Sequence, residues 1–276
     1  MNLQSVMTKM RTVTIFLCVI FVFFSCRQTV IEYNEIYQVR YITMEFTDTH
    51  GPGDILLSNG EWVLARDINK LTKERLDATP AIGVLVYEKE GVTNADPRIP
   101  VVMGLEILTD AKWSEQSVEN TSISDLKGSP KVSNLASGKD SSGKIKSKMG
   151  NCANYPLFDY ADSYSVEYNG VPEYDWYVPS ITELTYAFIG KGGIETSFNK
   201  LHELDPDAYK TKSLDSGVYV SCNESLEGVR FVWNLTWSQN PNKKESGPGS
   251  LRCTQKSYTA LDGLTFCGMF FHDFAY

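Results

Sequence analysis

Strand-like patterns lie at both ends of this chain, and helical patterns lie only between them. Near the start, Asn59-Gly60 separates residues 54–57, which are apolar after Asp54, from the apolar stretch 62–64. This arrangement indicates a hairpin, because both turn positions need a positive φ. A continuous apolar run at residues 81–87 and a largely apolar run at 100–107 predict two buried strands. The order of strands, then helices, then strands favours an α+β domain over one built from βαβ units.

Helical periodicity begins at Leu157, Tyr160, Ala161 and Tyr164, and Pro156 suits the first turn of that helix. Before it, the polar residues 67–79 are expected to hold a short helix.

A second helix is predicted to begin at Ser180, because Ser180 and Glu183 have the spacing of a capping box. Glu183 is therefore interpreted as a helix cap and not as a catalytic acid. A third helical segment at 198–204 is expected to stop at Pro206. Glycines are expected to end the second helix, at Gly190, Gly192 and Gly193.

The last seventy residues again have strand patterns, and we expect these strands to complete the sheet begun by the first ones. We therefore expect a single domain without internal repeats. The predicted strands are residues 217–221, 229–237, 251–254 and 264–271.

The first 25 residues have the layout of an export signal. Lys9 and Arg11 precede a wholly apolar run at 15–24, and Ser25 then stands before Cys26. Ten apolar residues are too few to span a bilayer, which needs about 20. We expect lipidation at Cys26, so that residues 1–25 are a signal peptide and the mature protein is lipid-anchored to the cell envelope, at the outer membrane. The alternative is a simply secreted protein in which Cys26 is incidental.

Charge argues against a nucleic-acid partner. Removing the signal leaves 251 residues and takes away two positive charges, which moves the net charge from −8 to −10. Phosphate backbones demand a basic face, so nucleic acid is not expected as a partner.

Four cysteines remain after the signal and the lipid are set aside: Cys152, Cys222, Cys253 and Cys267. Disulfides persist in exported proteins, but three pairings are open and free buried thiols are the alternative. Their spacing fits no zinc knuckle, and we expect no metal and no cofactor.

Two long polar stretches, 114–149 and 239–250, are predicted surface loops. Trp237 lies at the end of a predicted strand beside the second loop. An exposed aromatic residue at such a place suits stacking on a sugar or anchoring a protein. Trp237, Asn240 and Asn242 are therefore the predicted ligand-binding residues, whereas Trp176 is expected in the core.

Four motifs are similar to those of the Fibrobacter-type major paralogous domain, a family of exported proteins common in Bacteroidota. Residues 54–60 resemble its "GDI-x-x-S-D-G" hairpin, and residues 81–87 resemble its "PIGVVFY" strand. Residues 176–184 resemble "W-x-L-P-(S/T)-x-x-E-L", and residues 219–224 resemble "Y-W-S-S-T-E" with Val and Cys substituted. The residues that carry the resemblance are Asp54, Gly60, Trp176, Pro179, Ser180, Glu183, Leu184, Tyr219 and Ser221.

The resemblance implies a C-type lectin-like fold over residues 51–276, preceded by a lipidated tether and first strand at 26–50. It implies two or three helices, a twisted antiparallel sheet, adjacent N- and C-terminal strands and long loops. This fold hosts binders of several kinds as well as enzymes, so the resemblance is informative about fold more than about function.

The sequence gives little support to an enzyme or to a calcium-dependent lectin. Formylglycine-generating enzymes share the fold, but Cys253 and Cys267 lack a matching motif, and His272 is expected too far along its strand from Cys267 to act as a base. The segments 233–235 and 240–242 lack the acidic members that a calcium-binding lectin needs, and Asp205-Pro206-Asp207 is interpreted as a helix-ending turn.

The sequence therefore predicts a non-catalytic envelope lipoprotein whose C-type lectin-like domain binds a protein or glycan. The alternatives are a structural component of an envelope or pilus assembly, and a diverged formylglycine-generating-type enzyme.

Overall fold

The computed structural model describes residues 29–33, 39–43, 50–89, 98–110, 112–114, 138–140, 142–143, 155–211, 214, 217–224, 231–237, 250–255, 260–261 and 264–274. In the strands within 29–43 and 231–267, the description covers the backbone alone. The predicted signal peptide and Cys26 lie outside these residues. The chain divides into two units, Met1–Glu45 and Phe46–Tyr276, and each is described by itself.

The first unit contains one antiparallel hairpin. Strand β1 (Thr29–Tyr33) pairs with β2 (Val39–Thr43), with Thr29 opposite Thr43. The segment predicted as a tether with a first strand thus holds two paired strands.

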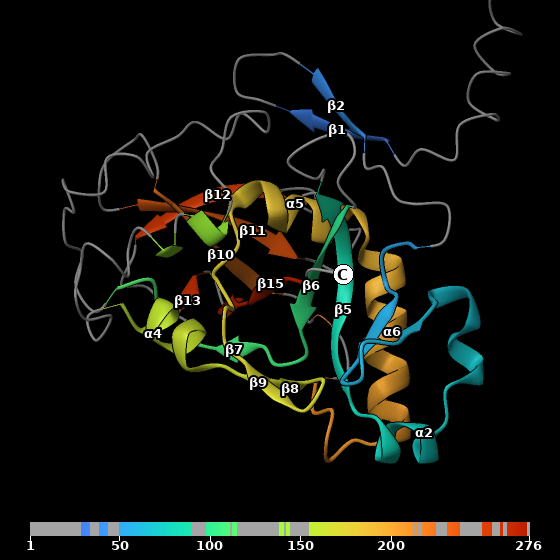
Figure 1. The fold of residues 1–276 in the computed structure, drawn as a ribbon. Coiled ribbons are helices and arrows are strands. Elements are labelled where there is room, and N and C mark those ends of the chain that lie inside the picture. The colour runs from blue at the N-terminus through green and yellow to red at the C-terminus, as the bar shows by residue number, and fades with distance from the viewer. Residues whose placement is uncertain are drawn as a thin grey trace, which may run out of the picture. The chain divides into compact units, whose positions relative to one another are not determined.

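The second unit has a five-stranded antiparallel sheet in the order β15-β6-β5-β3-β4 (Figure 1). Its strands are β3 (Ile55–Leu57), β4 (Trp62–Val63), β5 (Ala81–Lys89), β6 (Ile99–Gly104) and β15 (Phe271–Asp273). The C-terminal strand β15 therefore joins a sheet that the early strands begin. The predicted strand 100–107 is shorter than expected, because β6 ends at Gly104.

The predicted hairpin at Asn59-Gly60 is confirmed, because β3 and β4 are paired. Gly60 has a φ of 82°, and its N–H donates to the carbonyl of Leu57 at 2.9 Å. Just before β3, the buried carboxylate of Asp54 accepts hydrogen bonds from the N–H groups of Ala65 at 2.7 Å and Gly51 at 3.1 Å. Asp54 therefore fixes both ends of this hairpin to the neighbouring chain.

The helices follow the sequence patterns. The predicted short helix appears as a 3-10 turn η1 (Ala65–Lys70) and α2 (Lys73–Ala78). Next come α4 (Pro156–Ser163), which starts with proline as predicted, and α5 (Ile181–Ile189), whose capping box between Ser180 and Glu183 is present.

The prediction that Gly192 and Gly193 end α5 is wrong. Gly190 ends α5 and α6 (Lys191–Leu204) starts at the next residue, so Gly192 and Gly193 lie in its first turn. The reason is close packing: a Cβ on Gly193 would lie 2.2 Å from the carbonyl oxygen of Pro52. Glycine there allows the chain before β3 to cross α6 in direct contact.

A second sheet has the order β12-β11-β10-β14-β13, and β7 (Leu108–Thr109) also pairs with β14. Its other strands are β10 (Gly217–Glu224), β11 (Phe231–Trp237), β12 (Ser250–Gln255), β13 (Ala260–Leu261) and β14 (Leu264–Gly268). A separate hairpin joins β8 (Val166–Tyr168) to β9 (Val171–Glu173).

The first sheet is antiparallel, as predicted, but the expectation that one sheet holds all the strands is wrong. The described strands form two large sheets, and β10 runs parallel to β14. The predicted strand 264–271 breaks at Met269-Phe270, which sends β14 and β15 to different sheets. Within the second unit, β6 and β5 lie between the C-terminal strand β15 and β3.

Helix α5 links the two sheets, because it contacts β5 in the first and β10 and β11 in the second (Figure 1). The side chain of Asn223 on β10 accepts the N–H of Ile181 at 2.7 Å, which satisfies an otherwise unpaired donor at the helix start. The mixed arrangement of sheets and a few helices fits the predicted α+β class.

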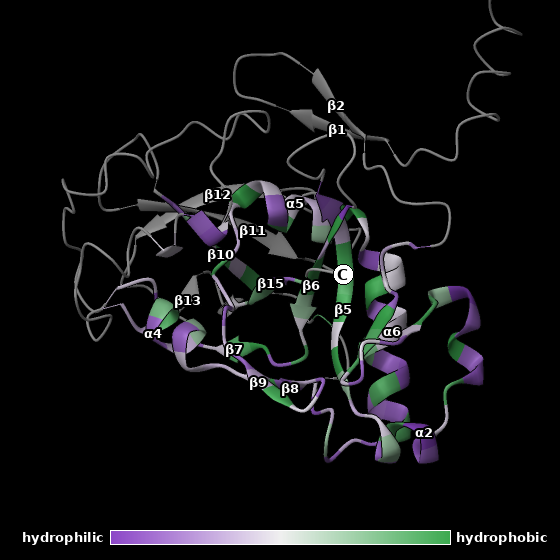
Figure 2. Ribbon diagram, in the orientation of Figure 1, coloured by the Kyte–Doolittle hydropathy of each residue, from purple (hydrophilic) through white to green (hydrophobic). Residues whose placement is uncertain are grey.

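The core is dominated by aromatic and branched side chains. Trp176 is buried, as predicted, and packs edge-on against Tyr164 with ring centroids 4.9 Å apart. Figure 2 shows the hydrophobic colouring of β5 and the alternation of hydrophobic and hydrophilic residues along α6. Helix α6 therefore buries only one of its faces.

Candidate functional site

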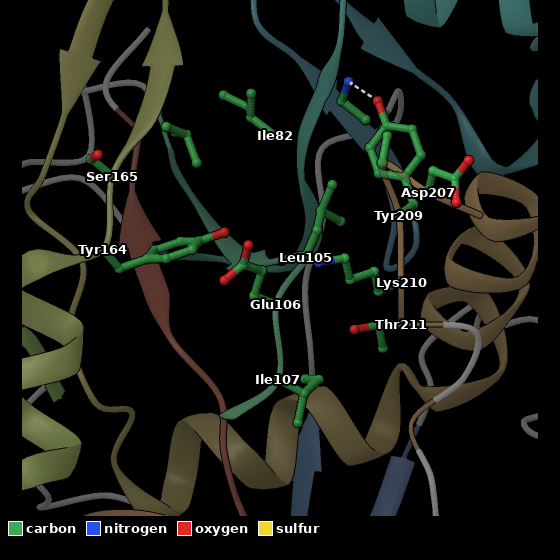
Figure 3. Close-up of a pocket in the computed structure, with 13 residues that line it drawn as sticks. Ile82, Leu105, Glu106, Ile107, Tyr164, Ser165, Asp207, Tyr209, Lys210 and Thr211 are labelled. Carbon is green, nitrogen blue, oxygen red and sulfur yellow. Dashed lines mark hydrogen bonds between the residues drawn. The ribbon is translucent and has the colours of Figure 1, made fainter. Parts of the chain in front are cut away.

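A cleft of about 440 Å³ opens beside the start of β5. Four segments line it: residues 81–82 on β5, 105–107 after β6, 164–166 before and within β8, and 207–211 after α6 (Figure 3). These segments are far apart in the sequence, so the cleft exists only in the folded domain.

The carboxylate of Glu106 lies in the middle of this cleft. Glu106 is exposed, and its Oε2 accepts a hydrogen bond of 2.8 Å from the Tyr160 hydroxyl on α4. Burial, together with the hydrogen bond and negative charge of Glu106, raises the pKa of Tyr160 to about 12. The phenol therefore keeps its proton at neutral pH and holds Glu106 in place as a donor.

Tyr164 forms one wall and extends toward Glu106 (Figure 3). Its ring stacks against the Tyr160 ring with centroids 6.2 Å apart, and it packs edge-on against the Trp176 ring with centroids 4.9 Å apart. A Cβ on Gly104 would lie 3.1 Å from Cε1 of Tyr164, so the absence of a side chain at Gly104 makes room for this ring. Burial, with Glu106 as the next cause, raises the pKa of Tyr164 well above its ordinary range.

The opposite wall carries Asp207, Lys210 and Thr211 (Figure 3). Asp205 ends α6 and accepts the N–H groups of Asp207 and Ala208, which confirms the predicted helix-ending turn. The hydroxyl of Tyr209 accepts the N–H of Ala81 on β5 at 2.9 Å. This hydrogen bond connects the segment 207–211 to the first sheet and helps to position the neighbouring Lys210.

The cleft thus brings carboxylates, an ammonium group and hydroxyls together beside fixed aromatic rings. Such a lining can donate to and accept from a ligand that carries many hydroxyl groups, whereas it offers little to a purely apolar one. Sequence reasoning missed this site. The sequence pattern predicts Tyr160 and Tyr164 only as part of an apolar helix stripe, and no local motif marks Glu106 or Lys210.

The predicted ligand-binding residues are not tested by the structure. Trp237 is the last residue of β11, where only the backbone is described, and Asn240 and Asn242 lie outside the described residues. Most of the two predicted surface loops lies outside them as well. A binding face formed by these loops stays a prediction.

Apart from Asp54 and Gly60 at the β3–β4 hairpin, the residues that resemble the family motifs lie around the start of α5 and on β10. Pro179, Ser180 and Leu184 are buried around the start of α5, and Tyr219 and Ser221 are buried on β10. These positions support packing and helix capping.

The interpretation of Glu183 as a cap alone is wrong. Its Oε2 does accept the N–H of Ser180 at 2.7 Å, as a capping box requires, but it also accepts the N–H of Gly138 at 2.9 Å. Its Oε1 accepts the hydroxyls of Tyr87 at 3.0 Å and Tyr177 at 3.2 Å. Glu183 is therefore the centre of a buried polar network that no local spacing predicts.

Burial and the charge of Glu183 raise the pKa of both phenols in this network, Tyr87 and Tyr177, well above the ordinary range. Both hydroxyls keep their protons and serve as donors. The carboxylate is thereby stabilised in a site where an unpaired charge would be costly.

The cysteine pairing stays open. Cys222 is buried on β10, Cys253 and Cys267 lie on strands with described backbone only, and Cys152 lies outside the described residues. Within the described ranges, no group of three histidine, cysteine, aspartate or glutamate side chains is placed to hold a metal.

The prediction that His272 and Cys267 share one strand is wrong. Cys267 lies on β14 and His272 lies on β15. The buried imidazole is paired with Glu173, with Nε2 and Oε1 at 3.0 Å. Burial lowers the pKa of His272, while Glu173 acts in the opposite direction.

Within the parts of the chain that the structure describes, every helix is too short or too polar to cross a membrane. No protein-family model, curated protein or solved structure matches the chain.

Proposed function

We propose that this protein is a non-catalytic envelope lipoprotein that binds a saccharide in the Glu106 cleft, defined by residues 81–82, 105–107, 164–166 and 207–211. The observation that carries the proposal is the meeting of Glu106, Tyr164 and Lys210 in one open cleft (Figure 3).

The chemistry of a saccharide suits this lining. Sugar hydroxyls can donate to the carboxylate of Glu106 and accept from the ammonium of Lys210, and hydrogen bonds to charged groups are the stronger kind. The less polar face of a sugar ring can pack on a tyrosine ring such as Tyr164. A cleft of about 440 Å³ also falls within the usual range of ligand pockets, about 300–1,000 Å³.

The architecture favours binding by a preformed site. Tyr160 and Gly104 fix Glu106 and Tyr164 from one side, and Tyr209 anchors the other wall to β5. A site whose groups are already held in position loses little freedom when the ligand arrives.

The location follows from the sequence pattern. A lipid on Cys26 would anchor the protein to the outer membrane, and the net charge of −10 after signal removal gives no support to a nucleic-acid partner. The motif resemblance adds support for an exported protein with a C-type lectin-like domain as the binding unit.

A glycan array probed with the labelled full chain tests this function. We expect retention of a defined set of saccharides by the wild type and its loss in Glu106→Gln. Glu203→Gln is the matched control, because Glu203 is an exposed glutamate on α6 that is not part of the cleft. If no saccharide is retained, or if Glu106→Gln retains the same set with the same signal, the proposal is wrong.

A further inference from the structure

Lys89 and Asp273 meet across the first sheet. Lys89 is the last residue of β5, Asp273 is the last residue of β15, and both strands pair with β6 between them. The Nζ of Lys89 lies 2.8 Å from Oδ1 and 3.0 Å from Oδ2 of Asp273. The Lys89 amine therefore contacts the Asp273 carboxyl group, although the two residues are 184 positions apart in the sequence.

A third ionisable group stands beside this pair. The Oε1 atom of Glu183 lies 3.5 Å from Nζ of Lys89, and the Glu183 side chain is only 4% exposed. The side chains of Lys89 and Asp273 are themselves 21% and 16% exposed. Water therefore has limited access to a cluster of one amine and two carboxyl groups.

Tyr177 completes the cluster. Its hydroxyl lies 2.8 Å from Oδ1 of Asp273 and 3.2 Å from Oε1 of Glu183, and Nζ of Lys89 lies 5.3 Å from its ring centroid. The phenol has one proton, and its contact with Asp273 is the shorter of the two. This proton can be donated to the Asp273 oxygen that would gain negative charge if the carbon beside it were attacked. Donors held in advance at such an oxygen are a principal source of catalysis.

We infer that Lys89 and Asp273 condense to an intramolecular isopeptide bond, with Glu183 as the catalytic residue that carries the proton. Glu183 takes a proton from the Lys89 ammonium. The Tyr177 hydroxyl, which contacts both carboxylates, gives its own proton to Asp273 and takes the one held by Glu183. The neutral amine then attacks Cγ of Asp273 and forms the C–N bond, while one C–O bond breaks.

The atoms and charges of this step balance. In net terms, of the three ammonium protons, one stays on the new amide and two leave with the Asp273 oxygen as water. Glu183 ends as the carboxylate it was at the start, and nothing is oxidised or reduced.

The bond would tie β5 to the C-terminal strand β15. It closes a loop of 184 positions, and a covalent link over a long loop restricts the unfolded chain strongly. An exported protein gains from such a link because its lifetime depends on how rarely it opens. This inference is independent of any ligand in the Glu106 cleft.

Tandem mass spectrometry of a tryptic digest of the purified full chain tests the inference. We expect a branched peptide in which Lys89 is joined to the C-terminal peptide 257–276, lighter than the two parts by one water molecule. Trypsin cleaves after Lys89 only if its amine is free. Quantitative recovery of a chain cleaved after Lys89, together with the linear C-terminal peptide, would overturn the inference.

Two variants distinguish loss of the isopeptide bond from loss of the fold. Lys89→Arg keeps a cation opposite Asp273 but lacks the amine, so the branched peptide should vanish and the denatured chain should migrate more slowly on a gel. Glu183→Gln keeps a capping side chain at the start of α5, so the fold should remain while bond formation is lost. A Glu183→Gln chain that forms the bond at the wild-type rate would refute the role given to Glu183.

The chain contains its own control pair. Lys73 and Asp205 also form a hydrogen-bonded ion pair, but the Lys73 side chain is 49% exposed. The same digest should show Lys73 without a cross-link. A cross-link at both pairs would indicate a chemical artefact and contradict a reaction specific to the Glu183 cluster.

Discussion

The hydroxyl of Tyr160 donates a hydrogen bond of 2.8 Å to Oε2 of Glu106. Through this bond, helix α4 positions the carboxylate at the centre of the proposed saccharide cleft. Neither residue is marked by a local motif, because one belongs to a helix stripe and the other follows a strand that ends two residues earlier.

Replacing Tyr160 by phenylalanine should change the alkaline stability of the protein. The folded-state pKa of about 12 lies above the ordinary 10.0, so the protonated phenol favours the folded state. That contribution is complete below pH 10.0 and is lost as the pH rises through about 12. In urea titrations across this window, Tyr160→Phe should lose less free energy of unfolding than the wild type. Tyr174→Phe, at an exposed tyrosine, should behave as the wild type, and an equal loss in all three chains would contradict the assignment.

Glu183→Ala should be strongly destabilising. The change leaves the hydroxyls of Tyr87 and Tyr177 without their shared acceptor and removes the carboxylate next to Lys89. Removing one member of such a buried network costs about 3–5 kcal/mol. Urea unfolding followed by circular dichroism measures this. Glu203→Ala, on the exposed face of α6, should stay within about 0.5 kcal/mol of the wild type.

Two neighbouring glycines of α6 should respond in opposite directions to alanine. At Gly193 a Cβ would lie 2.2 Å from the Pro52 carbonyl oxygen, so Gly193→Ala should cost about 1–3 kcal/mol through forced movement of the backbone. At Gly192 a Cβ meets nothing within 4 Å, so Gly192→Ala should stabilise the helix by up to about 1 kcal/mol. Thermal unfolding of both variants measures the difference. Similar effects of the two changes would show that the 50–53 segment does not pack on α6 as described.

His272 should make the protein sensitive to acid. Burial lowers its folded-state pKa below the ordinary 6.5, so the neutral imidazole favours the folded state. This contribution is complete above pH 6.5 and is lost as the pH falls through the lower folded-state value. His272→Gln keeps a donor for Glu173 and should flatten the decline in the free energy of unfolding below pH 6.5. An unchanged decline would show that other groups cause the acid sensitivity.

Local chemistry predicted the local structure of this chain well. Asn59-Gly60 specifies a hairpin and Ser180 with Glu183 specifies a helix start, because each depends on residues within a few positions. The parallel pairing of β10 with β14 has no comparable local signal, because the two strands are more than forty residues apart.

The same limit explains what sequence reasoning missed at the sites. Lys89 and Asp273 become neighbours only because β5 and β15 both pair with β6. Gly193 was assigned to a helix end because its actual constraint, the contact with Pro52, comes from a distant segment. Pairwise contacts across the sheets, and not periodicity, determine both the Glu106 cleft and the Glu183 network.

Calorimetric titration with a saccharide retained on the array tests the central claim most directly. Loss of the Glu106 charge weakens hydrogen bonds worth about 1.5–3 kcal/mol, so Glu106→Gln should bind about 10- to 140-fold more weakly than the wild type. Glu203→Gln, carrying the same change outside the cleft, should bind as the wild type does. Equal dissociation constants for the wild type and Glu106→Gln would contradict the assignment of the cleft as the saccharide site.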